Sequence, residues 1–233
     1  MSNESFNFSK FIQDSRHALL KPKEFFATMP TTGGFVEPII KAVLYGTIAG
    51  IFALIWSLLH IGQIGGGLMG GLLGNAVGIM AFISAIIGAL VGLFIGGVFV
   101  LLASAICGGS TDYEASVRVT ASLMVLSPVS AFFGFLGFLS ILSSLVGLIV
   151  SLYGVWMLYH ALIGSLKGKA ETSKIVGIVL AVIVAIFSIM GMASKKMVSD
   201  FSNKYEDVMK EAMEEYEEAT EEVLEDLENA EEE

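Results

Sequence analysis

The sequence predicts an all-α integral membrane protein, a bundle of five membrane-spanning helices with an N-terminal interfacial amphipathic helix and an acidic C-terminal helix. Three observations support this class. The 233 residues have a mean hydropathy of +0.76 and only 15% are charged, whereas soluble domains have about a quarter. Uncharged apolar stretches long enough to cross a hydrocarbon core of about 30 Å recur along the chain. Charge is concentrated in residues 197–233, which hold sixteen acidic residues and two lysines.

The segment 1–36 precedes the first predicted span and carries an amphipathic helix at 6–20. Its apolar residues, Phe11 among them, recur on one face. Such a helix lies either in the membrane interface or on the protein's own cytosolic face, and the pattern leaves both open. Beyond it, we expect Phe25 and Phe26 to anchor the chain at the level of the lipid headgroups.

The segment 37–194 holds the five predicted spans. A Gly108-Gly109 turn and a short polar loop separate the second span from the third. Pro128 lies inside the third span and predicts a kink there. In chain order, the spans cover about 38–60, 82–106, 117–139, 144–166 and 175–194.

A glycine-rich stretch at 62–80 has no charge and belongs to an uncharged run that is too long for one span. We interpret it as a helix partly outside the core, a re-entrant segment, or a tilted extension of the second span. No Lys-Ser/Thr follows the glycines, so a phosphate-binding loop is excluded. Small residues every four positions predict a glycine zipper, a surface for close helix packing within the chain or between copies. Its glycines are Gly66, Gly70, Gly74, Gly78, Gly88, Gly92 and Gly96.

Lysine and arginine set the orientation, because these residues collect in short cytoplasmic loops. With five spans and a cytoplasmic N-terminus, that side holds eight of them, and two outer loops hold none. A sixth span at 62–80 would move Arg118 and the three lysines of 167–174 outside. We therefore expect a cytoplasmic N-terminus and an outer tail, in the cell membrane if the host is prokaryotic.

The residue pattern argues against catalysis and metal binding. In the predicted topology His60 and His160 lie on opposite sides of the bilayer, so with His17 they cannot form a three-histidine site. Cys107 is the single cysteine, which excludes an internal disulfide and a cysteine-based zinc site. No His-carboxylate motif of a hydrolase is present. We expect a protein that is not an enzyme and that binds no cofactor, metal or nucleic acid.

Eight polar residues meet on the cytosolic face in this topology. Ionisable groups at membrane depth are costly and usually pair, so we expect Arg118 to bridge to Asp112 or Glu37. The cluster is either a salt-bridge collar that pins the helices or a binding surface or gate for a small solute. Its members are Glu37, Lys41, Asp112, Tyr113, Glu114, Arg118, His160 and Lys167.

The tail at 197–233 combines an apolar stripe, with residues spaced by three or four, and an otherwise anionic helix. The stripe indicates a partner helix or surface. The alternative is a solubilising acidic tail that binds nothing.

Three segments resemble the Yip1 domain family. The first is KPKEFFATMPTTGGFVEPIIKAVLYG (21–46), the second is CGGSTDYEASVRVTASLMVLSPVSAF (107–132), and the third is the GSLKGKAETSK link between the last two spans. The resemblance covers about residues 18–194. It implies a five-span membrane protein with a cytosolic N-terminus.

Eukaryotic members of that family are linked to vesicle trafficking between endoplasmic reticulum and Golgi and bind small prenylated GTPases, whereas prokaryotic relatives mostly have no assigned activity. This chain resembles the prokaryotic type, since it lacks the long cytosolic N-terminal region and the Asp-Leu-Tyr-Gly-Pro motif. We expect a non-enzymatic protein that organises the membrane or recruits protein partners, with the bilayer as its environment and homo-oligomers possible. The alternative is a channel or transporter for a small or neutral solute.

Overall fold

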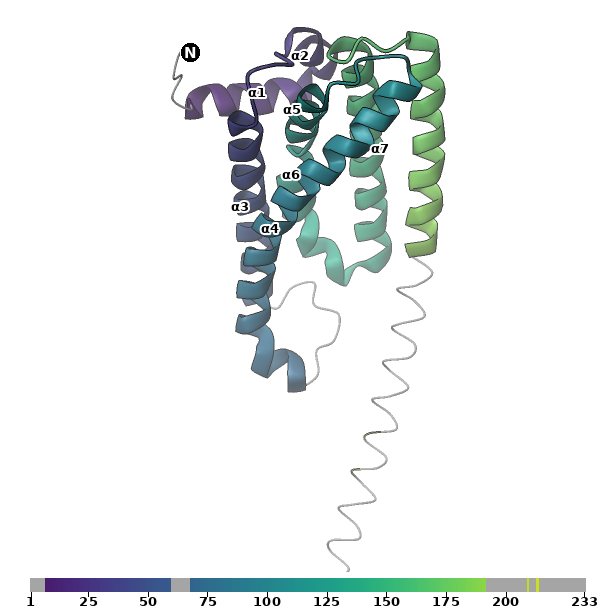
Figure 1. Cartoon of the computed structure of the whole chain (residues 1–233). Helices are drawn as coiled ribbons and strands as arrows, with labels where there is room; N and C mark the ends of the chain where they lie inside the picture. The colour runs from purple at the N-terminus through teal and green to yellow at the C-terminus, as the bar shows by residue number, and fades with distance from the viewer. Residues whose placement is uncertain (1–6, 60–67, 192–208, 210–212, 214–233) are drawn as a thin grey trace, which may run out of the picture. The chain divides into compact units, whose positions relative to one another are not determined.

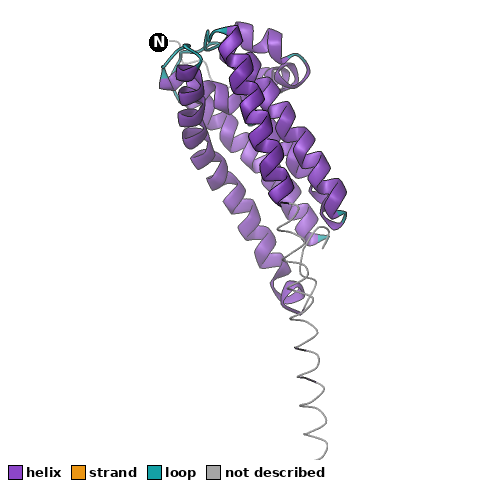
Figure 2. Ribbon diagram, turned by 90° about the vertical axis from the view of Figure 1, so that its right-hand side faces the viewer, coloured by secondary structure: helices purple, strands orange, loops and turns teal. Residues whose placement is uncertain are grey.

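The computed structural model describes residues 7–59, 68–191, 209 and 213, which form helices and loops without a β-strand (Figure 2). The chain divides into two compact units, Met1–Ile189 and Met190–Glu233. Only four residues of the second unit are described, so the packing below is that of the first. Nearly all of the acidic tail lies outside the described residues, as do His60 and Gly66.

Among the described residues, five helical segments are long and apolar enough to cross a membrane, which confirms the predicted all-α class with five spans. They are α3 (Val36–Leu58), part of α4 (Leu68–Ile106), the broken run of α5 (Tyr113–Leu123), α6 (Leu126–Phe132) and the 3-10 helix η1 (Phe133–Phe138), most of α7 (Ser140–Gly164), and Ala170–Gly191.

Helix α4 is one continuous helix of 39 residues, so residues 68–80 of the glycine-rich stretch extend the second span. At 1.5 Å per residue it is about 58 Å long, roughly twice the thickness of the hydrocarbon core. It crosses α3 obliquely (Figure 1). A tilted path is one way in which a bilayer accommodates a helix longer than its core.

Helices α1 (Phe8–Leu20) and α2 (Pro22–Thr28) lie at the end of the bundle that also holds the α4–α5 loop and the loop after α7 (Figure 1). The side chain of Asn7 begins α1 by accepting a hydrogen bond from the Lys10 amide at 3.1 Å. Pro22 is the first residue of α2, a position where its missing N–H breaks no helical hydrogen bond.

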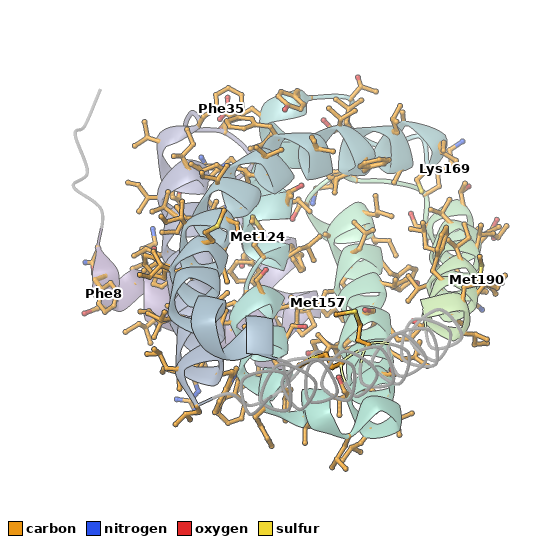
Figure 3. All side chains as sticks on the ribbon, turned by 90° about the horizontal axis from the view of Figure 1, so that it is seen from below. Phe8, Phe35, Met124, Met157, Lys169 and Met190 are labelled. Carbon is orange, nitrogen blue, oxygen red and sulfur yellow. The ribbon has the colours of Figure 1, made fainter. Side chains whose placement is uncertain are left out.

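Helix α1 buries one face and exposes another. Phe11 and Ala18 are buried against the bundle, whereas Phe8 is 58% exposed at its periphery (Figure 3). The Phe11 ring packs on Tyr45 of α3 with centroids 5.0 Å apart. The Ser15 hydroxyl also hydrogen-bonds the Tyr45 hydroxyl at 2.7 Å. One side of α1 is thus docked on the protein, and the other is open.

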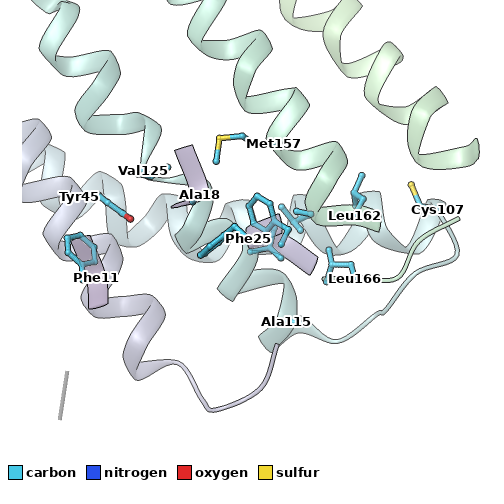
Figure 4. Packing of buried hydrophobic residues seen from close by; sticks show 14 residues of the cluster. Phe11, Ala18, Phe25, Tyr45, Cys107, Ala115, Val125, Met157, Leu162 and Leu166 are labelled. Carbon is cyan, nitrogen blue, oxygen red and sulfur yellow. The ribbon is translucent and has the colours of Figure 1, made fainter. Parts of the chain in front are cut away.

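Phe25 and Phe26 lie in the buried core, which corrects the expectation that they anchor the chain at the headgroups. Phe25 lies near Leu162 of α7 (Figure 4), and a Cβ at Gly164 would come within 2.8 Å of the Phe26 backbone. The Ser165 hydroxyl donates to the Phe26 carbonyl at 2.7 Å. A buried aromatic ring removes a large apolar area from water, so the close approach of α2 to α7 favours this position.

The α3–α4 contact depends on two glycines of α3 that the sequence analysis did not single out. A Cβ at Gly46 would lie 2.8 Å from the Ala89 Cβ, and a Cβ at Gly50 would lie 2.9 Å from the Phe82 ring. Glycines one turn apart remove the side chains that would separate the two backbones. Helices α3 and α4 therefore meet through α3 glycines and small or flat α4 residues.

The predicted zipper on α4 does not form one packing surface within this unit. Gly78 approaches Ser57 and Gly96 approaches Thr120, each within 3 Å of an added Cβ, but nothing lies within 4 Å of one at Gly88 or Gly92. Gly70 and Gly74 also lie in α4. Ala89 and Leu93, next to Gly88 and Gly92, are buried, so the middle of α4 packs through another face and these last two glycines lie off it.

Two loops are joined at the α1–α2 end. Gly108 has φ of +66°, a conformation that disfavours residues with a Cβ. The Ser110 amide then donates to the Leu166 carbonyl at 2.7 Å, and the Lys169 amide donates to the Cys107 carbonyl at 2.9 Å. These bonds hold the α4–α5 loop beside the link that follows α7.

The third span is broken between α5 and α6, at Met124 and Val125. Pro128 follows four residues after Met124, and a proline ring clashes with the carbonyl of the residue four positions earlier. The Ser127 amide donates to that Met124 carbonyl at 2.9 Å in a tighter turn. The helix therefore breaks at Met124, the residue whose carbonyl would clash with the Pro128 ring.

The close α3–α4 approach can be tested with alanine. We expect Gly46→Ala to lower the free energy of unfolding by about 1–3 kcal/mol, because the added methyl overlaps Ala89 and the Ala85 carbonyl. Thermal unfolding in detergent measures the change. The matched control is Gly88→Ala, which meets open space and gains about 1 kcal/mol of helix propensity. Equal losses for both variants would contradict the described contact.

Candidate functional site

Arg118 of α5 is the centre of a polar network at the α1–α2 end of the bundle, and its side chain is only 6% exposed. Its Nε donates to the Pro30 carbonyl at 3.0 Å and its Nη1 donates to the Gly34 carbonyl at 2.9 Å. Its Nη2 bonds Glu37 Oε2 at 2.5 Å. The planar guanidinium thus uses all its nitrogens on a single segment, residues 30–37, a geometry that lysine cannot reproduce.

Lys41 adds a second buried cation one helical turn after Glu37. Its Nζ lies 2.8 Å from Glu37 Oε1 and 3.8 Å from Asp14 Oδ2 of α1. Glu37 therefore bridges Lys41 and Arg118 through its two oxygens. We call these four residues, Asp14, Glu37, Lys41 and Arg118, the ion-pair network. It joins α1, α3 and α5, and the pairing offsets the cost of burying charge.

The backbone conformation of the loop before α3 places the Pro30 and Gly34 carbonyls next to Arg118. Gly33 and Gly34 have φ of +129° and +83°, which L side chains rarely adopt. A Cβ at Gly33 would also lie 3.3 Å from Arg118 Nη1. The Gly34 amide donates to the Glu114 carboxylate at 2.6 Å, so this loop is held from both sides by α5 residues.

Asp112 and Tyr113 have local structural roles at the start of α5. The Asp112 carboxylate caps α5 by accepting from the Glu114 amide at 2.9 Å. The Tyr113 hydroxyl donates to the Phe94 carbonyl of α4 at 3.0 Å. Asp112 was one of the two expected partners of Arg118, and the structure shows Glu37 in that position instead.

His160 and Lys167 share this end of the bundle, but no described contact joins them to the ion-pair network. The His160 ring packs edge-on against Trp156, with centroids 4.8 Å apart, and against Tyr159. Lys167 is exposed and has φ of 57° in the turn after α7. Of the eight residues in the sequence-based cluster, the structure brings Glu37, Lys41 and Arg118 into direct contact. Glu114 of α5 binds the same loop through the Gly34 amide.

Asp14 and the backbone acceptors of Pro30 and Gly34 were not predicted from the sequence. Asp14 is on the polar side of an amphipathic helix, and nothing in that pattern distinguishes it from a solvated charge. The TTGG sequence before the first span was a usable signal, because paired glycines mark a turn whose carbonyls can point inward.

A pocket of about 260 Å³ opens beside the ion-pair network, between α1, α2, α3 and α5. Its charged side chains are three cations and two carboxylates, and His17 also faces it. This arrangement can hold a polar or charged group by hydrogen bonds and ion pairs. Within the described part of the chain, no group of three or more His, Cys, Asp or Glu side chains could hold a metal ion. The lining residues are Lys10, Asp14, His17, Phe25, Thr28, Met29, Pro30, Glu37, Pro38, Lys41, Arg118, Ala121 and Ser122.

Comparison with known proteins gives one family. The Yip1 domain model matches residues 16–192, which include the last five residues of α1, all of α2 to α7 and the segment Ala170–Gly191. No curated protein and no solved structure matches the chain.

We expect Arg118→Leu to lower the free energy of unfolding by about 1–3 kcal/mol, because the Pro30 and Gly34 carbonyls lose this donor, whereas Glu37 is 37% exposed and keeps Lys41 as a partner. Arg118→Lys keeps the charge and should show a smaller loss. Unfolding of the purified protein in detergent measures both.

The control for these variants is Lys167→Gln, an exposed position for which we expect a change within about 0.5 kcal/mol. Wild-type stability in Arg118→Leu would mean that the network does not hold this end of the bundle.

Proposed function

This chain belongs to the Yip1 domain family, and from that we propose that it organises the membrane or recruits a protein partner through the α1–α2 end of its bundle. It is an integral membrane protein with five membrane-spanning helical segments among its described residues. The family is generally non-enzymatic and generally interacts with proteins. We propose the same for this chain.

The observation that carries this proposal is the ion-pair network. Residues 7–35, which we call the cap, hold α1, α2 and the loop to α3. The network joins this cap to the buried Lys41 of α3 and Arg118 of α5. Tyr153 of α7 and Ser165, which directly follows α7, donate to backbone carbonyls of the cap. A preorganised surface loses less conformational entropy on binding than a free segment does. The cap is therefore suited to present a fixed polar surface.

The charge on that surface favours a cytosolic position and an acidic partner. Lys10, Arg16, Lys21 and Lys23 are exposed on the cap, and basic residues next to short loops favour the cytoplasmic side. A basic surface attracts acidic partner surfaces and speeds their association.

The arrangement of charge in the spans favours this role over ion-coupled transport. Each Lys, Arg, Asp or Glu of the five described spans lies within the first two turns of its segment. Glu37, Lys41 and Arg118 are also paired with one another. Ion-coupled transporters place their polar ligands near the middle of the bilayer, and no charged residue of the described spans lies there.

Photocrosslinking in membranes tests the recruiting role. With a photoreactive residue at the exposed Gln13 of α1, we expect an adduct with one defined protein. The control with the same probe at exposed Ile178 of the last described helix should give none. Arg16→Glu with Lys23→Glu should reduce the Gln13 adduct severalfold at unchanged membrane abundance, because both exposed charges are reversed.

Solute flux through purified protein in liposomes tests the alternative role as a channel or transporter. Passage of a small neutral solute at a rate clearly above that of protein-free liposomes, together with no Gln13 adduct, would contradict recruitment and support a channel or transporter.

A further inference from the structure

The pocket beside the ion-pair network has an uneven distribution of polar groups. Asp14, Glu37, Lys41 and Arg118 compensate one another within the protein. Lys10 and His17 of α1 also line the pocket, one helical turn or less from Asp14. Counting Lys10 gives the lining side chains one positive charge in excess. His17 Nε2 lies 3.7 Å from a carboxylate oxygen of Glu24, which does not line the pocket.

Lys41 keeps hydrogen-bonding capacity toward this space. Its ammonium group has three N–H donors. Glu37 lies within hydrogen-bonding distance at 2.8 Å, whereas Asp14 at 3.8 Å is beyond it. Lys41 is 7% exposed and lines the pocket, so an acceptor for its remaining N–H groups must enter this space. An acceptor group that enters the pocket can take these donors.

The position of the pocket restricts what enters it. It lies where the cap meets the first two turns of α3 and residues 118–122 of α5. Both helices begin membrane-spanning segments. Helix α1 also exposes Phe8 and Ile12, on the side of the helix away from Lys10, and such apolar side chains suit the interfacial region of a bilayer. Phe25, Met29 and Pro38 form an apolar part of the wall.

We propose that this pocket binds the phosphodiester headgroup of an anionic phospholipid, with Lys10, His17 and Lys41 as the phosphate-binding residues. A phosphodiester carries one negative charge, which matches the excess charge of the lining. A volume of about 260 Å³ holds a phosphate and its glycerol, whereas the acyl chains remain in the bilayer. Basic pockets between transmembrane helices are a known form of lipid recognition. This inference concerns a lipid ligand and does not depend on recruitment of a protein partner.

The test uses the full chain in detergent with added phosphatidylglycerol or phosphatidylcholine. Native mass spectrometry measures the retained lipid, and thermal unfolding measures stabilisation. We expect phosphatidylglycerol to be retained in preference to phosphatidylcholine and to raise the unfolding temperature more. Lys10→Gln should weaken phosphatidylglycerol retention about fivefold, the effect expected for loss of one cation near an anionic lipid, and His17→Gln should also weaken it. Neither side chain is buried, so both variants should fold.

The matched control is Arg16→Gln, which removes an exposed cation of α1 that does not line the pocket. It should leave phosphatidylglycerol retention within twofold of the wild type. Equal loss in Arg16→Gln and Lys10→Gln would overturn the pocket in favour of general surface attraction. Equal retention of the two lipids would overturn the choice of an anionic headgroup.

A soluble phosphate is the other source of the same chemistry. Inorganic phosphate and glycerol 3-phosphate are therefore tested at millimolar concentration without lipid. If either raises the unfolding temperature as much as phosphatidylglycerol does, and Lys10→Gln removes that effect, the ligand is a soluble anion and the lipid assignment is wrong.

Discussion

The Arg118 guanidinium joins two parts of the chain that are 81 to 88 residues apart. A charge that is nearly excluded from solvent within a membrane-spanning segment is tolerated only when its donors are satisfied. Arg118 meets this requirement through two carbonyls and one carboxylate of residues 30–37. The loop before α3 must therefore keep one conformation, and Gly33 and Gly34 supply the positive φ values for it.

The position of the cap follows from the fixed conformation of the loop before α3. Once the loop is fixed, α2 is held close to α7, where Phe26 is buried and its carbonyl accepts from Ser165. Helix α1 then lies over the ends of α3 and α5, so Asp14 reaches Lys41. The pocket is what remains between these helices. Its cationic lining is thus a by-product of the residues that hold the cap in place, extended by Lys10 and His17.

The sequence was sufficient for the class of fold and for part of the polar network. Long apolar runs identify the spans directly, and the need to pair a charge at membrane depth was enough to propose Glu37 or Asp112 as the partner of Arg118. Asp14 was missed because its partner is set by how α1 docks, which no local pattern encodes. Gly46 and Gly50 were not predicted, because two glycines in an apolar helix give little signal beside the longer glycine stripe on α4. A four-residue repeat drifts around a helix with 3.6 residues per turn, so one oblique neighbour cannot cover it all.

The direction of the Arg118 contacts has a consequence for biosynthesis. Pro30, Gly34 and Glu37, which supply its acceptors, all precede it in the chain. A ribosome makes the N-terminal part first, at about 5–20 residues per second, so these acceptors leave it several seconds before the arginine does. The buried cation is then inserted after the groups that neutralise it have been made. If the arginine were synthesised before its acceptors, its N–H donors would enter the bilayer unpaired. Membrane insertion of the third span would then be less favourable.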